Sequence, residues 1–109
     1  MSKEFLNKTA VLTGAGSGIS AALCKAFSEE GANIAALDID LEAAENTIRQ
    51  IRNTGGTGSA YRVNVADFQM VNDVCDKIIK DFKTVDIWVN CAGISYIIPF
   101  LECTEEIWD

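Results

Sequence analysis

Residues 13–19 of the chain read Thr-Gly-Ala-Gly-Ser-Gly-Ile, follow the apolar run Thr9–Leu12 and open a helical pattern. Glycines between a strand and a helix let the backbone turn sharply and approach a pyrophosphate, which then meets the unpaired N–H groups and the positive dipole end of the helix. The dipole alone is worth only about 0.3 to 2 kcal/mol. A dinucleotide site therefore needs further contacts along the chain, and without them the same residues are a flexible turn.

The composition fits one globular domain, because the chain has 109 residues, 49% of them hydrophobic, and a single proline. The net charge is −7 and the nine Lys and Arg residues form no basic patch, which excludes nucleic-acid binding through phosphate neutralisation. The start Met1–Leu6 has no apolar signal region, and the stretch Ile94–Leu101 is too short to span a bilayer. We therefore expect a cytoplasmic protein outside the membrane.

The cysteines indicate neither a metal site nor thiol catalysis. Cys24, Cys75, Cys91 and Cys103 have no C-x-x-C spacing, and the chain has no histidine that could complete a zinc site or act as a base. In a reducing compartment their thiols stay reduced. Cys75 shares an apolar helical face and is expected to be a small core residue.

Apolar spacing predicts strands at residues 8–13, 32–37, 59–63 and 85–90, with a helix after each of the first three. Asp40 and Asp67 are expected to cap the second and third helices, and Gly31 and the Gly55-Gly56 pair to end the first and second. Three buried helical stripes are predicted: Ile19, Ala22, Leu23, Ala26 and Phe27; Leu41, Ala44, Ile48 and Ile51; Val71, Val74, Cys75, Ile78, Ile79 and Phe82.

This alternation predicts an α/β fold in which right-handed crossovers give a parallel sheet with helices on both faces. The expected strand order is 3-2-1-4, so that the winding direction reverses beside the glycine turn, where open α/β sheets bind ligands.

The end of the chain looks truncated. Ile87, Trp88 and Val89 are apolar on both faces of a strand predicted to be an open edge, and a helix beginning at Thr104 reaches only Asp109. We therefore expect either the first part of a longer protein or association through the strand-four edge, for example in a homo-oligomer.

Polar or glycine-rich segments follow all four predicted strands. After the glycine turn, Asp38 lies 20 residues beyond Gly18, where a carboxylate can accept hydrogen bonds from ribose hydroxyls. The alternative interpretation is that Asp38 is only a solvated aspartate at the end of a strand. A carboxylate repels a 2′-phosphate and neither Ser17 nor Ile39 supplies a positive charge, so NAD is favoured over NADP.

A family resemblance rests on these segments: Thr13-Gly14-x-x-x-Gly18-Ile19, Asp38, Asn64-Val65 and Asn90-Cys91-Ala92-Gly93-Ile94. They resemble the N-terminal half of a short-chain dehydrogenase/reductase over nearly the whole chain. The resemblance implies a Rossmann fold forming a single, partial NAD-binding domain over residues 1–109, and hydride transfer between nicotinamide and a carbonyl or alcohol carbon of a small-molecule substrate. It implies contacts to the phosphates and ribose from Gly14, Ser17, Gly18 and Ile19, to adenine from Asn64 and Val65, and to the nicotinamide side from Asn90, Ala92 and Gly93.

Three positions depart from the family pattern. Ser20 stands where the family has glycine and adds a hydroxymethyl group where helix and strand pack closely. Asn64 replaces a common aspartate, and Cys91 replaces a common asparagine with a weaker hydrogen-bonding partner.

No catalytic residue is predicted in this chain. The family uses a tyrosine followed four residues later by lysine, but Tyr61 is followed by Val65 and Tyr96 by Phe100. Tyr61 is expected to pack on a strand and Tyr96 to lie in a loop near the cofactor, so the chain alone is predicted to be inert.

Two other functions stay open. One is a non-catalytic module that binds a dinucleotide and a partner protein. The other is an S-adenosylmethionine methyltransferase-like domain, which also has a glycine-rich first turn and an acidic residue after strand two. The segment Asn90–Gly93 favours the dehydrogenase.

Overall fold

The computed structural model describes residues 4–16, 18–91 and 96–98. Within these ranges strands and helices alternate as far as the fourth strand, and a fifth strand follows it. The elements in chain order are β1 (Thr9–Thr13), α1 (Gly18–Glu29), β2 (Asn33–Asp38), α2 (Leu41–Asn53), β3 (Thr57–Arg62), α3 (Phe68–Phe82), β4 (Ile87–Asn90) and β5 (Tyr96–Ile98). The four predicted strands and three predicted helices are confirmed, with strand ends shifted by one or two residues.

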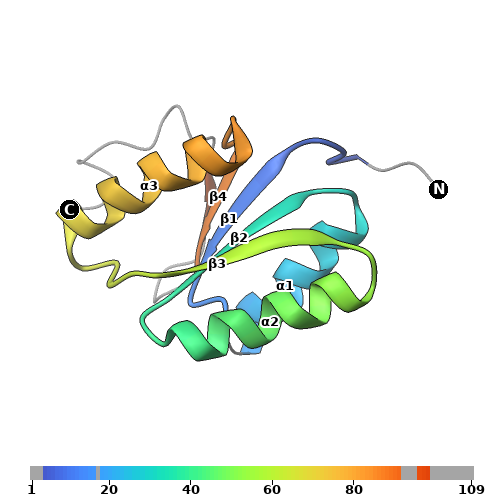
Figure 1. The fold of residues 1–109 in the computed structure, drawn as a ribbon, viewed down its shortest axis with the longest axis horizontal. Coiled ribbons are helices and arrows are strands. Elements are labelled where there is room, and N and C mark those ends of the chain that lie inside the picture. Colours follow the sequence, from blue (N-terminus) through green and yellow to red (C-terminus); the bar gives the residue numbers. More distant parts are fainter. Residues whose placement is uncertain (1–3, 17, 92–95, 99–109) are drawn as a thin grey trace.

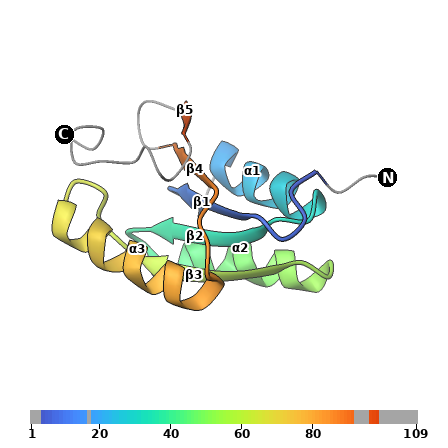
Figure 2. The ribbon, with the colours of Figure 1, turned by 90° about the horizontal axis from the view of Figure 1, so that it is seen from above.

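The strands form one sheet in the order β3-β2-β1-β4-β5 (Figure 2). β1 runs parallel to both of its neighbours, with Leu12 opposite Ala36 in β2 and Val89 in β4. β2 and β3 are also parallel. The predicted order 3-2-1-4 is confirmed, and the carboxyl ends of β1 and β4 meet where the winding direction reverses.

The helices cover both faces of the sheet, with α3 on one side and α1 and α2 on the other (Figure 1). Successive strand residues point to opposite faces. In β1, Ala10 and Leu12 join the core cluster with Cys24 of α1 and Ile48 of α2, whereas Val11 joins the cluster under α3. Every residue of β1 is buried, as expected for a central parallel strand.

Capping side chains define where two of the helices begin. Asp40 accepts a hydrogen bond from Ala43 N at 3.2 Å, and Asp67 accepts one from Met70 N at 3.1 Å. Both predicted N-caps are therefore confirmed. After α1 and α2 the chain turns at Gly31 and Gly55, whose φ angles of 95° and 90° suit glycine, as predicted.

The predicted buried stripe of α1 is wrong in part. Ile19 is 80% exposed, and Ala22 and Ala26 are exposed, whereas Ser20 and Cys24 are buried. Hydrophobicity alone ranks Ile19 above Ser20, but the small serine allows α1 to lie close to β1. At the margins of the other two stripes, Leu41 is 36% and Ile79 is 38% exposed.

The prediction that β4 is an open edge, available for association, is also wrong. β5 pairs with β4 in antiparallel register and occupies that edge. Trp88 is fully buried and Val89 is 2% exposed, because β4 is an interior strand covered on both faces. Tyr96, expected in a loop, belongs to β5. The predicted helix at Thr104 lies outside the described residues.

Three of the four cysteines lie in the described part of the chain. Cys24, Cys75 and Cys91 form no disulfide, and Cys103 lies outside the described part of the chain. Half-buried Cys75 packs against the cluster under α3. Across the described ranges, no helix is long and apolar enough to cross a membrane, and no group of three potential metal ligands comes together.

Tyr61 links the edge strand β3 to α3, because its hydroxyl donates to Asp81 Oδ2 at 2.5 Å. It packs against the cluster under α3, as predicted for a strand residue. Burial and then the Asp81 carboxylate raise the pKa of Tyr61. The folded state thus holds the phenol proton more tightly than the unfolded chain, and this contribution to stability is present below about pH 10 and is lost as the pH rises further.

We predict that Tyr61→Phe lowers the free energy of unfolding at neutral pH by about 1 kcal/mol, because the hydrogen bond is lost. Above about pH 10 the wild type should lose stability more steeply than the variant. Urea unfolding at pH 7, 9 and 11 measures both effects. Parallel losses of stability above pH 10 would show that Tyr61 is not the titrating group.

Candidate functional site

The turn between β1 and α1 is tied to the end of β2. Gly14 and Gly18 have φ angles of 62° and 58°, in the left-handed region that glycine tolerates. Between them, Ala15 is fully buried and its N–H donates to Leu37 O at 2.9 Å. The described part of the turn, residues 14–16, is therefore joined to the end of β2 by a backbone hydrogen bond. Ser17, a predicted site residue, lies outside the described residues.

Asp38 is held by hydrogen bonds to both of its carboxylate oxygens. Oδ2 accepts from Gly16 N at 2.9 Å, and Oδ1 accepts from Asp40 N at 3.0 Å. The side chain is half-buried at the carboxyl end of β2. It is therefore not the solvated strand-end aspartate of the alternative interpretation. Each oxygen keeps a second lone-pair direction for another donor.

Gly16 is not among the site residues predicted from the sequence. A Cβ atom at this position would lie 2.3 Å from Ala43 Cβ, 2.8 Å from Ala43 C and 3.0 Å from Asp38 Oδ2. The first turn of α2 thus approaches the glycine turn so closely that only glycine fits. The signal was present as a glycine at every second position from Gly14 to Gly18.

Ser20 occupies the gap between α1 and β1 without disturbing it. Its hydroxyl donates to Thr13 O at 2.7 Å, and the side chain is 3% exposed. The hydroxymethyl group that departs from the family pattern therefore satisfies a carbonyl at the end of β1. Next to it, Gly18 and Ile19 begin α1 and are both exposed at the turn.

Thr13 joins the ends of β1 and β4. Its Oγ1 donates to Asn90 Oδ1 at 3.0 Å and accepts from Cys91 N at 3.0 Å. The bond from Cys91 comes from its backbone, so the change from asparagine to cysteine does not remove it. Ala92 and Gly93, predicted beside Asn90, lie outside the described residues.

Cys24 packs in the core cluster that contains Leu12 of β1 and Val89 of β4. Burial, and then the neighbouring Cys91, raise the pKa of Cys24 to about 12. The thiol therefore stays protonated at neutral pH, and a protonated thiol is a poor nucleophile. Cys24 is a core residue on the buried face of α1.

A cavity of about 160 Å³ opens at the carboxyl ends of β1, β2 and β3. It brings together four of the predicted site residues, Gly14, Asp38, Asn64 and Val65, and adds Leu37, Ile39 and Val63. Asn64 is exposed, and its Oδ1 accepts from Ala66 N at 3.0 Å, which fixes the bend after β3. The wall is thus mainly apolar with one carboxylate, and none of these seven lining residues carries a positive charge.

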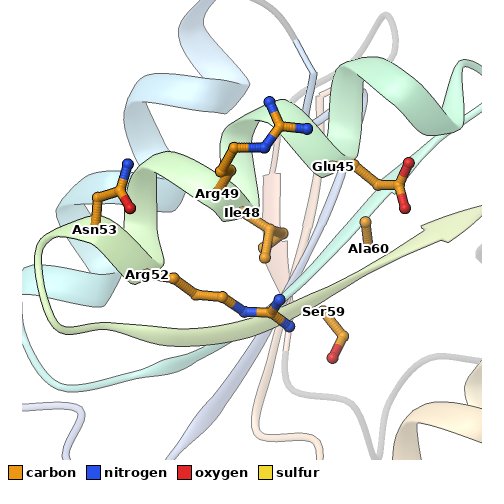
Figure 3. A pocket seen from close by; sticks show the side chains of 7 residues that line it. All are labelled: Glu45, Ile48, Arg49, Arg52, Asn53, Ser59 and Ala60. Atoms are coloured by element: carbon orange, nitrogen blue, oxygen red, sulfur yellow. The ribbon is translucent and has the colours of Figure 1, made fainter.

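A larger cavity of about 560 Å³ lies elsewhere, between α2 and β3 (Figure 3). Figure 3 shows Ile48 pointing into it and Arg52 reaching across to β3. Arg49 donates to Asn46 Oδ1 at 3.2 Å, and Arg52 donates to Gly58 O at 2.6 Å. None of the predicted site residues lines this larger cavity. The bond from Arg52 satisfies a backbone carbonyl of the edge strand β3.

The fold and the crevice at the strand ends define a doubly wound, Rossmann-like α/β protein. Residues 8–109 match the family model described as short chain dehydrogenase. A D-threitol dehydrogenase from Mycolicibacterium smegmatis is 37% identical over 102 residues, which cover 94% of this chain and 39% of that protein. The 3beta-hydroxysteroid dehydrogenase 1 of Eggerthella lenta is 36% identical over 109 residues, which cover 99% of this chain and 42% of that protein.

Solved structures agree with these matches. The crystal structure of an NAD⁺-bound xylitol dehydrogenase has a TM-score of 0.79 and 33% identity, with a match that covers 84% of this chain and 35% of that one. The chain therefore belongs to the short-chain dehydrogenase family. It spans less than half the length of the relatives it matches.

We predict that Gly16→Ala destabilises the protein by about 1–3 kcal/mol, because the new methyl group overlaps Ala43. Ala43→Gly should restore part of that loss in the double variant, since it removes the Cβ contact but leaves the contact with the backbone carbon. A double-mutant cycle from urea unfolding measures the coupling. Ala22→Gly, at an exposed position of α1, is the control and should show no coupling. Additive effects of the changes at positions 16 and 43 would contradict the steric explanation.

Proposed function

We propose that this chain is the cofactor-binding part of an NAD-dependent oxidoreductase. The observation that carries the proposal is the cavity at the strand ends, where Gly14, Asp38, Asn64 and Val65 meet around a carboxylate held by Gly16 N. The NAD⁺-bound xylitol dehydrogenase and the D-threitol dehydrogenase support it, since the name of each is that of an oxidoreductase. In this proposal residues 1–109 form a single nucleotide-binding domain.

Asp38 provides the preference for NAD over NADP. The remaining lone pairs of its carboxylate accept hydrogen bonds from the adenosine ribose hydroxyls. A 2′-phosphate at the same position would meet a negative charge, and no lysine or arginine lines the cavity to offset it. Asn64, Val65 and the exposed Ile39 form the adenine side.

The phosphates and the nicotinamide would lie along the turn and the end of β4. Gly18 and Ile19 open α1, whose unpaired N–H groups and dipole favour an anion, and Ser17 precedes them in the sequence. Asn90 is positioned by Thr13 Oγ1 and, with Ala92 and Gly93, lines the nicotinamide side. The bound cofactor supplies hydride exchange with a carbonyl or secondary alcohol carbon of a small-molecule substrate.

The chain by itself is proposed to be inert. Residues 1–109 contain no tyrosine followed four residues later by lysine, so no side-chain pair of that kind is present to move the proton of the substrate oxygen. The same observation favours a second candidate, a natural module that binds a dinucleotide without catalysis. Turnover by the 109-residue chain would refute both statements. Membership of the dehydrogenase family disfavours the S-adenosylmethionine methyltransferase-like alternative.

We predict that the chain binds NAD more tightly than NADP and does not bind S-adenosylmethionine. Asp38→Asn keeps an acceptor for Gly16 N but removes the charge, and should reduce the NAD-to-NADP affinity ratio by roughly tenfold or more. Isothermal titration calorimetry with the three ligands measures these affinities.

Asp76→Asn, at an exposed position of α3, is the matched control, because it changes the net charge equally at a distance from the cavity. It should leave the ratio unchanged. Tighter binding of NADP by the wild type would refute the role of Asp38, and equal effects of the two variants would assign the preference to net charge instead.

A further inference from the structure

Thr47 is a polar residue on the buried face of α2. It is 2% exposed and shares that face with Ala44, Ile48 and Ile51. Its Oγ1 donates to Ala15 O at 2.9 Å, whereas Ala43 O within its own helix lies at 3.4 Å. A hydroxyl has one proton to donate, so the shorter bond to the glycine turn is the stronger one. Thr47 thus connects the middle of α2 to the turn between β1 and α1.

The bond from Thr47 restrains a whole peptide unit and not only the carbonyl oxygen of Ala15. Ala15 O and Gly16 N belong to the same planar trans peptide unit, so they point in opposite directions and turn together. Thr47 holds the oxygen end of this unit at 2.9 Å, and Asp38 Oδ2 holds the N–H end at 2.9 Å. The orientation of the Asp38 carboxylate is therefore linked to the Thr47 hydroxyl through one rigid group.

This peptide unit needs such a restraint, because one of the two dihedral angles about which it turns, ψ of Ala15 and φ of Gly16, belongs to a glycine. Glycine at position 16 has few intrinsic steric limits on its φ angle, so the hydrogen bonds at the two ends of the unit are what oppose its rotation. After a rotation by half a turn, Ala15 O would face the Asp38 carboxylate, and two acceptors would meet without a proton between them. Ala15 is fully buried, so water cannot easily replace the lost bond.

We propose that Thr47 is a positioning residue for the dinucleotide site. Its hydroxyl locks the Ala15–Gly16 peptide so that Asp38 accepts from Gly16 N and presents its remaining lone pairs to the ribose. This inference rests on the proposed function, and it adds that part of the NAD preference depends on a residue of α2 that does not line the cavity.

The test compares variants that separate the hydroxyl from the shape of the side chain. Thr47→Val keeps the branched shape and removes the donor, whereas Thr47→Ser keeps the donor. Thr54→Val is the matched control, because Thr54 is the C-cap of α2 and its Oγ1 donates to Ile51 O, away from the glycine turn. We expect Thr47→Val to weaken NAD binding roughly tenfold and to lower the NAD-to-NADP ratio, with Thr47→Ser within about threefold of the wild type and Thr54→Val unchanged.

A merely structural role would give a different result. If Thr47→Val lowers the unfolding temperature but keeps the NAD affinity and the ratio, the positioning role is refuted. If Thr47→Ser weakens NAD binding as much as Thr47→Val does, the shape of the side chain is responsible and the role of the hydroxyl is refuted.

Hydrogen exchange at Gly16 N–H without any cofactor separates this inference from the proposed function. If the Thr47 hydroxyl restrains this peptide, the Gly16 N–H should exchange faster in Thr47→Val than in the wild type. It should exchange at the wild-type rate in Thr47→Ser and Thr54→Val. If the variants show this exchange pattern but the wild-type chain does not bind NAD, the result supports the positioning role of Thr47 and refutes the proposed function. Equal exchange rates at Gly16 N–H in all variants would refute the positioning role of Thr47.

Discussion

The hydrogen bond from Gly16 N to Asp38 Oδ2 joins the β1–α1 turn to the end of β2, and the rest of the site depends on it. Glycine is needed at position 16 because a side chain there would overlap Ala43 in the first turn of α2. The second carboxylate oxygen accepts from Asp40 N, and Asp40 in turn caps α2. One carboxylate therefore fixes the glycine turn, the end of β2 and the start of α2 together.

A second set of bonds joins β1 and β4, the strands between which the winding direction reverses. At the carboxyl ends, Thr13 Oγ1 bonds to Asn90 and to Cys91 N. At the other ends, Thr9 N donates to Asp86 Oδ2 at 2.9 Å, and Asp86 N donates to Thr9 O at 3.0 Å. The crevice is thus bordered by strands held at both ends, which limits how far its walls can move apart.

The sequence predicted the strand order, both helix caps and four of the seven residues that line the smaller cavity. These features depend on local patterns, namely apolar periodicity, capping side chains and glycines in turns. The face of α1 was predicted wrongly, because Ser20 is buried through a hydrogen bond that a hydrophobic stripe does not represent. The edge at β4 was also predicted wrongly, since pairing with β5 depends on residues later in the chain.

Gly16 and Thr47 were missed for a related reason. Their importance comes from contacts between segments about thirty residues apart, and such contacts follow from the packing of α2 against the turn and not from any local pattern. A threonine within a helical stripe usually indicates only a poor helix former. Its function is visible only once the carbonyl that it bonds is known.

The dual role of Asp38 constrains how cofactor preference could change in this chain. In the proposed function the same carboxylate builds the turn and contacts the ribose, so a substitution that admits a 2′-phosphate also removes an acceptor for Gly16 N or Asp40 N. Asparagine retains one acceptor oxygen, but its amide group would place donors against one of these two N–H groups. A change toward NADP that preserves the fold therefore requires a positive charge beside the cavity as well as a new acceptor for the turn. In the proposed function, the residue that determines specificity is therefore also a residue that holds the glycine turn in place.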